Sequence, residues 1–387
     1  MTTSNKLKVY LIAGEPSGDL LGSRLMRALE SKTNGNVEFY GLGGDTMEHQ
    51  GLKSLFDISD LAVMGLVEVI PSIPKVLKHI KQTVNHIKRI KPDIVITIDS
   101  WSFCSRIHKA LRKLNLGIKQ VHYVAPQVWA WKKRRAKTMY KYVDTLLALL
   151  PNEPQYFTKH HLPTYFVGHP VIESDALKAD GDVFRKKYGI EPSKQIISIL
   201  PGSRHTEVTK LLPDFLLAAK LLHEQNPDTV FALPTVKTVV NRVKHMAKGC
   251  NIPLYVLETE ADRYSAFQAS SAAIAASGTV ALELAICNIP HIIAYKVAPL
   301  TYFMAKYLVK IKYVNLTNIL LKKNIVPELL QDKCSPKNIV KHINEILKNG
   351  QSYETQMTGF AQVKNYLTSG NQTPSENAAD IILSLIK

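Results

Sequence analysis

The chain has 387 residues, of which 45% are hydrophobic and 21% charged. These values are typical of a soluble globular protein that is long enough for two domains, and no apolar run is long enough to predict a membrane span. The net charge of +17 is concentrated, because positions 75–141 hold seventeen basic and two acidic residues, a net +15.

The first half of the chain alternates apolar, strand-like runs with amphipathic helical patterns, which indicates a doubly wound α/β domain. The predicted strands cover 8–13, 37–41, 94–98, 120–124, 145–150 and 164–167. The predicted helices between them cover 20–30, 75–90, 104–114 and 134–142.

The second half restarts the same alternation after a break near 168–182, with strands predicted over 196–200, 229–232, 254–257, 272–276 and 289–294. We therefore predict two Rossmann-like domains, residues 1–170 and 171–365, whose strand ends face a central cleft. A C-terminal tail, about 366–387, is expected to pack back onto the first domain.

The turn Ser277-Gly278-Thr279 follows an apolar strand and opens a helix, and Glu283 lies one helical turn further on. Backbone N–H groups and the helix dipole make such a turn an anion site. A carboxylate at Glu283 can accept two hydroxyl hydrogen bonds, so the pattern indicates a nucleotide diphosphate on the turn and a ribose on the glutamate. Taken alone, the same residues also fit a helix cap followed by a solvated glutamate.

The motif Leu-Pro-Gly-Ser-Arg at 200–204 follows the first strand of the second half. Gly202 lets the backbone approach a ligand, and Arg204 can pair with a diphosphate through two hydrogen bonds. The alternative is a surface arginine after a turn. Its place beside the Ser-Gly-Thr turn in one predicted domain favours the ligand interpretation.

The first strand runs into Gly-Glu-Pro-Ser-Gly-Asp at 14–19, which lacks the lysine of a Walker loop. Its two acids, Glu15 and Asp19, repel phosphate, so this turn is expected to bind hydroxyls or position a base, unless it is only a capped strand–helix turn. Asp99 ends the 94–98 strand, where it can take a proton from a hydroxyl or cap the strand. The thirteen histidines form no H-E-x-x-H pattern, and we predict neither a metal nor a cofactor.

An apolar segment at 61–71 runs into a lysine-rich helix, and apolar side chains beside a basic rim favour contact with an anionic membrane surface. An ordinary amphipathic helix that covers a sheet explains the helix stripe alone. The residues predicted to face the membrane are Met64, Leu66, Val67, Val69 and Ile70.

Together these motifs resemble the lipid-A-disaccharide synthase family of GT-B glycosyltransferases. The resemblance rests on the motifs at 14–19 and 200–204, His-Tyr-Val-Ala-Pro-Gln-Val-Trp-Ala-Trp at 122–131, Ala-Ser-Gly-Thr at 276–279 with Glu283, and Val-Pro-Glu-Leu-Leu-Gln at 326–331. They cover essentially the whole chain in the expected order. Two positions depart from the family pattern, because Trp101-Ser102-Phe103 replaces Pro-Asp-Phe and Thr317 replaces the proline before Asn318.

The resemblance implies an inverting, metal-independent transfer from UDP-2,3-diacylglucosamine to 2,3-diacylglucosamine 1-phosphate, which forms a β-1′,6-linked disaccharide and UDP. It implies Asp99 as the base for the acceptor hydroxyl, with Glu15 and Asp19 as rivals. The other residues implied to bind substrate are Ser17, Gly18, Arg204, Ser277, Gly278, Thr279, Glu283, Asn318, Glu328 and Gln331.

The same function accounts for the charge map, since both substrates are acylated anions of the cytoplasmic leaflet of the inner membrane. The expected location is cytoplasmic and peripheral to that membrane, and the sequence leaves the oligomeric state, a homodimer included, open. One alternative is another UDP-sugar enzyme of the same fold, such as an epimerase. The other is a nucleic-acid-binding protein that uses the basic window, but it leaves the Ser-Gly-Thr and Glu283 site unexplained, so we expect no nucleic-acid partner.

Overall fold

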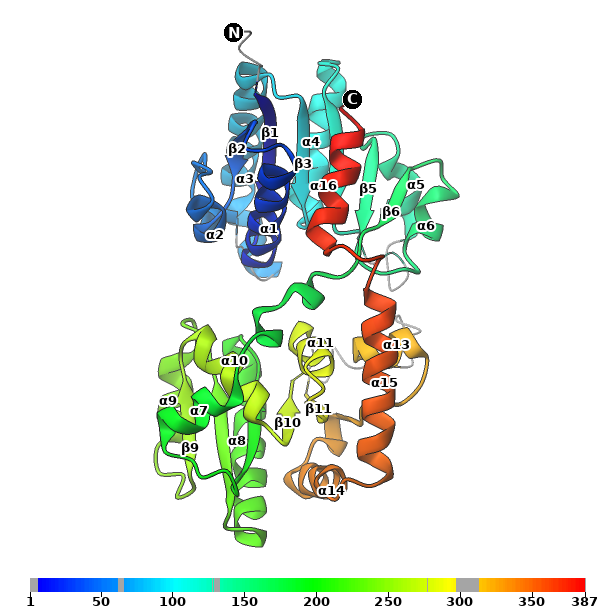
Figure 1. Ribbon diagram of the computed structural model, residues 1–387. Coiled ribbons are helices and arrows are strands. Elements are labelled where there is room, and N and C mark those ends of the chain that lie inside the picture. Colours follow the sequence, from blue (N-terminus) through cyan, green and yellow to red (C-terminus); the bar gives the residue numbers. More distant parts are fainter. Residues whose placement is uncertain are drawn as a thin grey trace. The chain divides into compact units, whose positions relative to one another are not determined.

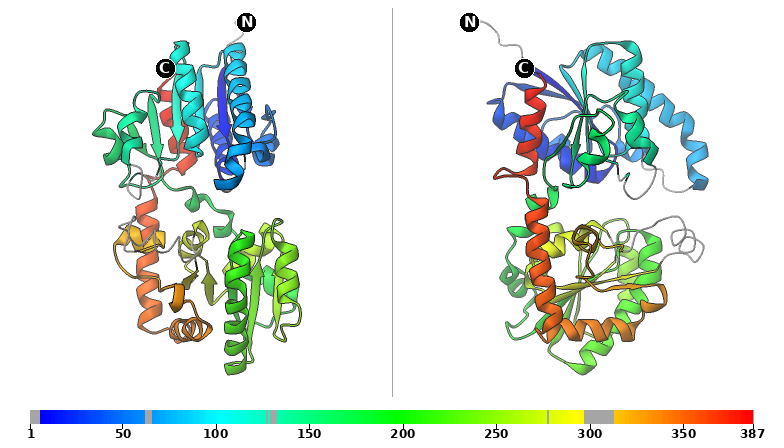
Figure 2. Two further views of the ribbon diagram at one scale, coloured as in Figure 1. Left: turned by 180° about the vertical axis from the view of Figure 1, so that it is seen from behind. Right: turned by 90° about the vertical axis from the view of Figure 1, so that its right-hand side faces the viewer.

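The computed structural model describes residues 6–61, 66–126, 128, 133–276, 278–296 and 313–386, and of residues 66–73 and 133 the backbone alone. The chain divides into two compact units, Met1–Pro170 with Leu367–Lys387, and Val171–Tyr366. Each unit is a parallel sheet with helices on both faces, as the ribbon views show (Figures 1 and 2).

The first unit holds a six-stranded sheet in the order β2-β1-β3-β4-β5-β6, in which every neighbouring pair is parallel. Its strands are β1 (Leu7–Ala13), β2 (Val37–Leu42), β3 (Ile94–Ile98), β4 (Lys119–Tyr123), β5 (Thr145–Ala148) and β6 (Thr164–Phe166). Its described helices include α1 (Pro16–Lys32), α2 (Asp45–His49), α3 (Leu66–Ile90), α4 (Trp101–Leu114), α5 (Ala136–Met139), α6 (Pro154–Thr158) and α16 (Pro374–Ser384).

The strands of this sheet are apolar throughout because both faces are covered. Val9 and Leu11 lie in one cluster with side chains of α1 and α16. Tyr10 and Ile12, which point to the opposite face, lie in a second cluster with side chains of α3 and α4. The C-terminal helix α16 thus completes the core of the first unit, and it lies beside α1 (Figure 1).

The second unit repeats this architecture with a parallel sheet in the order β12-β11-β10-β7-β8-β9. Its strands are β7 (Gln195–Leu200), β8 (Thr229–Pro234), β9 (Leu254–Leu257), β10 (Ala272–Ala275), β11 (His291–Tyr295) and β12 (Glu328–Leu330). Its described helices include α7 (Gly181–Tyr188), α8 (His205–Gln225), α9 (Val240–Ala247), α10 (Glu260–Ala269), α11 (Thr279–Ile286), α13 (Leu316–Leu321) and α14 (Pro336–Leu347); α15 (Gln351–Leu367) ends at the unit boundary.

Each sheet has one point where the strand order reverses. In the first unit the chain leaves β1 toward β2 and returns to the other side of β1 as β3; in the second it leaves β7 toward β8 and β9 and returns beside β7 as β10. Ligands of open α/β sheets bind outside the carboxyl ends of the strands at such points. Ligands are therefore expected at the loops that follow β1 and β3, and at those that follow β7 and β10.

Several elements differ from the sequence prediction. The helix predicted from residue 75 begins at Leu66, so it runs through Pro71 and Pro74. The fixed φ of proline is compatible with a helix, although each proline removes one backbone hydrogen bond. The helix predicted over 134–142 is shorter, with α5 confined to Ala136–Met139. The short edge strand β12 was not predicted, since three residues carry too little periodicity to be recognised.

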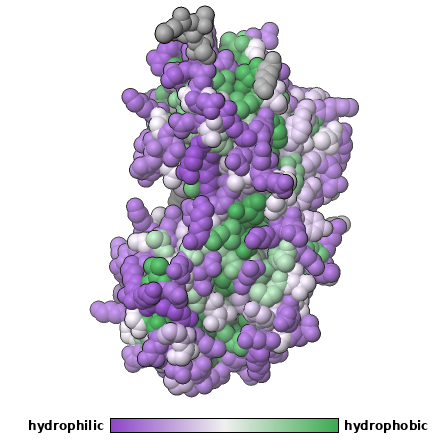
Figure 3. Space-filling model, viewed as in Figure 1, coloured by the Kyte–Doolittle hydropathy of each residue, from purple (hydrophilic) through white to green (hydrophobic). Residues whose placement is uncertain are grey.

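The surface is mixed in polarity. On the face drawn in Figure 3 hydrophilic residues predominate and hydrophobic ones form separate patches. Within the part of the chain that the structure describes, no helix combines the length and the apolar character that crossing a bilayer requires.

Candidate active site

The turn after β3 has an unusual backbone. Asp99 and Ser100 both adopt the left-handed conformation, with φ of 53° and 38°, which costs free energy in a residue with a side chain. The Asp99 backbone N–H donates to the Tyr123 carbonyl at 2.9 Å, and the Ser100 N–H donates to Asp99 Oδ1 at 2.8 Å. The turn therefore holds the Asp99 carboxylate in one orientation at the carboxyl edge of the sheet.

The loop after β1 meets this turn. The Ser100 hydroxyl donates to Glu15 Oε1 at 2.7 Å, and a Cβ on Gly14 would come within 3.3 Å of the Ser100 Oγ. A Cβ on Gly18 would lie 3.4 Å from the Ile98 carbonyl oxygen, which is ordinary van der Waals contact, so α1 packs closely on β3 here. Glu15 and Ser17 are exposed, so the first switch point presents carboxylates and a hydroxyl to solvent.

The Asp99 carboxyl is half-buried. Burial raises its pKa above the ordinary value, the neighbouring Glu15 carboxylate raises the pKa further, and the Ser100 N–H partly offsets both. A carboxylate that is easier to protonate than usual is a stronger base, which suits proton abstraction from a hydroxyl.

Asp19 is committed to the fold. Its Oδ1 accepts hydrogen bonds from the Gly44 and Met47 N–H groups, and its Oδ2 accepts from the N–H and hydroxyl of Thr46, all between 2.7 and 3.1 Å. The residue is 4% exposed. It thereby anchors the start of α2 on α1, and it has little capacity left to take a proton from a substrate.

In the second unit, the loop after β7 is held by Glu207, which the sequence analysis did not select. Glu207 Oε2 accepts from the backbone N–H groups of Ser203 and Arg204, and Oε1 accepts from the Arg204 guanidinium at 3.1 Å. The Tyr295 hydroxyl, from the end of β11, donates to the same Oε1 at 3.1 Å. Glu207 is three residues after the N-cap Arg204 and accepts from its N–H, which is half of a capping box; the arginine at the N-cap removes the usual sequence signal.

Arg204 remains available despite its partner, because its side chain is 61% exposed. It lies at the N-cap of the 21-residue helix α8, whose first backbone N–H groups and dipole favour an anion. Gly202, with φ of 103°, makes the turn that brings the two together. A guanidinium and a helix N-terminus at one place are suited to a diphosphate.

The loop after β10, the strand paired with β7, contributes the second anion-binding turn. Ser277 lies outside the described residues. Gly278 is the N-cap of α11 with φ of 139°, and Thr279 is the first helical residue; both are exposed. Glu283 is half-buried one turn further on, and its Oε1 lies 3.5 Å from the Ser174 hydroxyl. The strand, the turn at Gly278 and the helix that carries Glu283 occur where the sequence predicted them, and their role in binding stays a prediction.

Asn318 and Glu328 lie together, but they bind backbone. The Asn318 side chain accepts from the N–H groups of Ile325 and Val326 and donates to the Val326 carbonyl and to Glu328. Glu328 also accepts from the N–H groups of Val314 and Asn315 at 2.9 Å. The pair therefore shapes the segment around α13. Gln331 follows β12 in a left-handed conformation with φ of 52°.

The predicted membrane-facing residues are Met64 and four residues in the first turns of α3. Met64 and the side chains of Leu66, Val67, Val69 and Ile70 lie outside the described residues. Further along α3, Ile80, Val84 and Ile87 are buried against the sheet, so that stripe belongs to the core. Lys75, Lys78 and Lys81 of α3 are exposed. Leu77, three residues before Ile80 and on the same side of the helix, is 54% exposed.

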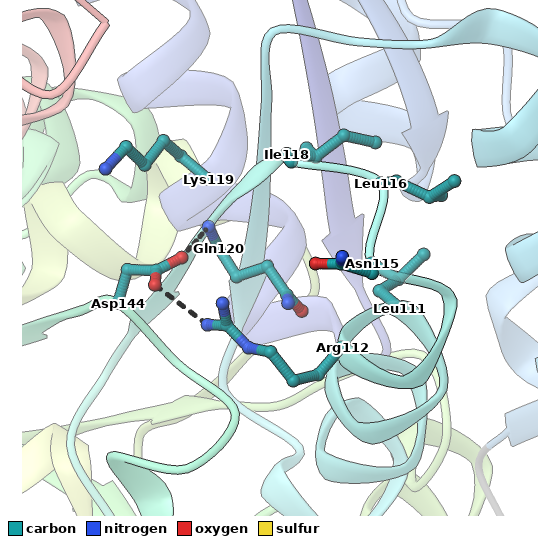
Figure 4. A pocket seen from close by; sticks show the side chains of 9 residues that line it. Leu111, Arg112, Asn115, Leu116, Ile118, Lys119, Gln120 and Asp144 are labelled. Atoms are coloured by element: carbon teal, nitrogen blue, oxygen red, sulfur yellow. Dashed lines mark hydrogen bonds and ion pairs between the residues drawn. The ribbon is translucent and has the colours of Figure 1, made fainter.

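A small cavity of about 120 Å³ lies at the opposite edge of the first sheet. Figure 4 shows its wall, where Asp144 bonds the Arg112 guanidinium and the Gln120 N–H, both at 2.8 Å. Lys119 begins β4 there, whereas Asp99 follows the last residue of β3. The cavity is therefore not part of the Asp99 site.

Comparison with known proteins identifies the family of the chain. The family model described as lipid-A-disaccharide synthetase matches residues 9–382. Lipid-A-disaccharide synthase from Rhodospirillum centenum is 45% identical over 98% of this chain and 95% of its own length. The enzyme from Pseudomonas putida is 39% identical over 99% of both chains.

Solved structures share the fold at low identity. UDP-GlcNAc 2-epimerase from Neisseria meningitidis, bound to UDP-GlcNAc, has a TM-score of 0.65 at 12% identity and covers 98% of this chain and 99% of its own. MurG from Acinetobacter baumannii has a TM-score of 0.57 at 15% identity and covers 98% and 99%. The fold class predicted from the sequence, two doubly wound domains of GT-B type, is confirmed. With a family model matched over nearly its whole length, the chain belongs to the lipid-A-disaccharide synthase family of UDP-sugar-dependent glycosyltransferases.

Proposed function

We propose that the two switch points divide the reaction of this family between the two units. Members of the family condense UDP-diacylglucosamine with diacylglucosamine 1-phosphate. The second unit would bind the UDP-sugar, and the first would bind the acceptor and carry the base. The observation that carries this assignment is that each switch point holds a family motif of suitable chemistry: carboxylates after β1 and β3, and anion-binding turns after β7 and β10.

In the second unit, the Arg204 guanidinium and the N-termini of α8 and α11 would hold the diphosphate of the donor. Their positive potential also favours departure of UDP, because charge develops on the leaving phosphate as the glycosidic bond breaks. Glu283 would accept hydrogen bonds from the ribose hydroxyls. A solved neighbour of the same fold is bound to UDP-GlcNAc, which supports a UDP-sugar as a ligand of this fold.

In the first unit, Asp99 would be the general base. The acceptor 6-hydroxyl attacks C1 of the donor sugar, its proton passes to the Asp99 carboxylate, and the C1–O bond to UDP breaks with its electron pair. Asp99 is favoured over its rivals because Asp19 is saturated by four hydrogen bonds and Glu15 is exposed and accepts from Ser100. Ser17 and the Glu15 carboxylate would contact acceptor hydroxyls, and Gly18 would lie beside them at the start of α1.

Asn318, Glu328 and Gln331 would affect donor binding mainly through the backbone conformation of the segment beside the donor. The side chains of Asn318 and Glu328 are hydrogen-bonded to backbone groups. They would therefore fix the segment around α13 against which the donor binds, without contacting the donor themselves.

The first unit would also dock on the cytoplasmic leaflet of the inner membrane. Its support is the exposed lysines of α3 together with the exposed Leu77 of the same helix, which give an anionic lipid surface both charge and apolar contact. Liposome flotation tests this proposal. Met64→Asp and Leu77→Asp should reduce binding to anionic vesicles, whereas Leu217→Asp, which alters an equally exposed leucine of α8, should not.

The reaction is tested by UDP release from UDP-diacylglucosamine, with and without the acylated 1-phosphate acceptor, in detergent micelles with EDTA. We expect acceptor-dependent release that Asp99→Asn lowers by about 10²- to 10⁴-fold with UDP affinity retained. Asp93→Asn, at the other end of β3, is the matched control and should stay active. Acceptor-independent UDP turnover, or full activity of Asp99→Asn, would reject the assignment of the transfer or of the base.

A further inference from the structure

Beneath the Asp99–Ser100 turn lies a chain of buried polar side chains that the reaction as described does not use. Thr97 of β3 is the register partner of His122 of β4. The Thr97 Oγ1 lies 2.6 Å from His122 Nδ1 and 2.7 Å from His108 Nε2, and His108 Nδ1 lies 2.9 Å from Gln120 Oε1. Thr97, His108 and His122 are 0% exposed and Gln120 is 2% exposed.

Hydrogen-bond directions along this chain follow from the chemistry of each atom. Gln120 Oε1 only accepts, so His108 Nδ1 carries a hydrogen. Burial lowers the pKa of His108 to about 4, and in the neutral ring Nε2 is therefore an acceptor. The single hydroxyl hydrogen of Thr97 goes to that nitrogen, because His122 Nδ1 can itself donate to the Thr97 oxygen and the Cys104 sulfur is a weak acceptor.

With its hydrogen spent on His108, Thr97 can only accept from His122. Burial lowers the pKa of His122 well below its ordinary value, so this ring is neutral too and carries its one hydrogen on Nδ1. His122 Nε2 is then a bare lone pair, and among the described residues no donor reaches it. The series of hydrogen bonds from Gln120 through His108 and Thr97 thus selects the Nδ1–H tautomer of His122. In this tautomer the buried Nε2 acceptor has no donor among the described residues.

His122 is also the support of the strained turn. The Trp101 ring, which follows directly after Ser100, packs edge to face on His122 with centroids 4.8 Å apart and lies 6.0 Å from His108. On the other side of the turn, the Asp99 N–H bonds to the carbonyl of Tyr123, the residue next to His122. Both ends of the turn therefore rest on the same stretch of β4.

We propose that His122 is a positioning residue for Asp99: the Gln120–His108–Thr97 chain fixes it as the Nδ1–H tautomer, and its ring then holds Trp101 and the left-handed Asp99–Ser100 turn in the reactive geometry. The proposal rests on the base role of Asp99. If Nε2 carried the hydrogen, the lone pairs of Nδ1 and Thr97 Oγ1 would face each other, and the ring would have to turn away from Trp101.

The test alters the hydrogen-bonded series at Thr97, a residue of β3 that lies two positions before Asp99. Thr97→Val removes the hydroxyl and keeps the shape, whereas Thr97→Ser keeps the hydroxyl. We expect Thr97→Val to lower kcat about tenfold to hundredfold, as displaced catalytic groups do, with UDP affinity unchanged, and Thr97→Ser to retain most of the activity. Thr145→Val, at a buried strand threonine of the same sheet, is the matched control and should behave as the wild type.

Nitrogen-15 spectra of histidine-labelled protein give an independent readout that a merely structural role would not move. Wild-type His122 should show the Nδ1–H tautomer without titration near neutral pH, and Thr97→Val should show a mixture or the Nε2–H form. An Nε2–H signal in the wild type overturns the proposal even if Thr97→Val fails to fold, and so does a folded Thr97→Val with unchanged kcat. Full activity of Asp99→Asn, with Thr97→Val still slow, rejects the base and leaves the role of His122 in the turn supported.

Discussion

The Ser100 hydroxyl donates a 2.7 Å hydrogen bond to the Glu15 carboxylate, while the Ser100 backbone N–H donates to Asp99. One residue thus ties together the loops that follow β1 and β3, the two strands on either side of the first switch point. The Glu15 charge, held near Asp99 by Ser100, raises the pKa of the Asp99 carboxyl. This coupling has consequences that can be measured.

Glu15→Gln should move the acid limb of the pH profile of kcat/KM to lower pH. The pKa of Asp99 is raised first by burial and then by the Glu15 charge. The glutamine keeps an acceptor for Ser100 but removes that charge, so ionised Asp99 becomes easier to form and its pKa falls. Glu30→Gln, at an exposed position near the end of α1, is the control. An unchanged or upward shift of the limb would show that Asp99 does not set it.

Asp99→Asn should raise the thermal midpoint of the protein at pH 7 while it lowers turnover. Because the folded-state pKa of Asp99 is above its unfolded value of 3.8, the ionised form is disfavoured in the fold. This penalty is absent below the unfolded pKa and develops as pH rises through the folded one. Asparagine also tolerates the left-handed backbone better than most residues. The gain, measured by calorimetry, should therefore shrink as pH falls toward 4; a lower midpoint at pH 7 contradicts it.

The position of Asp99 could be predicted from sequence, since an acidic residue that ends a buried strand in a parallel sheet must lie at the carboxyl edge. Its bond network could not. The contact of Ser100 with Glu15 depends on two consecutive left-handed residues, neither of which is glycine, and no local pattern signals that conformation. Likewise, Asp19 was a candidate base by position, and only the hydrogen bonds from the start of α2 show that it is a structural anchor.

The second unit shows the same division. The turns at Arg204 and Thr279 follow strands whose apolar runs are recognisable. The sequence therefore predicted that each turn joins the end of a strand to the start of a helix. Asn318 and Glu328 were assigned to the donor by resemblance, and their attachment to the 313–315 and 325–326 backbone depends on contacts between segments that sequence periodicity does not reveal. Position along the chain predicted where these loops lie in the fold. The hydrogen-bond partners of each polar group depend on tertiary contacts and could not be predicted.

Arg204→Ala should weaken UDP binding about tenfold to hundredfold, which corresponds to about 1.5–3 kcal/mol for hydrogen bonds to a charged group. Arg204→Lys should recover part of the loss, because a lysine keeps the charge without the two-pronged geometry. Lys194→Ala, a cation just before the amino end of β7, is the control. Calorimetric titration with UDP measures all three. Equal UDP affinity of Arg204→Ala and the wild type would place the diphosphate elsewhere.

Asn318→Ala should act on stability before it acts on chemistry. The substitution leaves the N–H groups of Ile325 and Val326 without their acceptor in a buried place, at about 1–3 kcal/mol for each unsatisfied group. We expect a lower midpoint in urea unfolding and a weaker UDP affinity that recovers at lower temperature, where the segment around α13 reforms. Asn338→Ala, whose side chain donates to a single carbonyl at an exposed site, should change neither by a comparable amount. If Asn318→Ala keeps wild-type stability but loses UDP affinity, Asn318 contacts the nucleotide directly, and the structural role assigned to it is wrong.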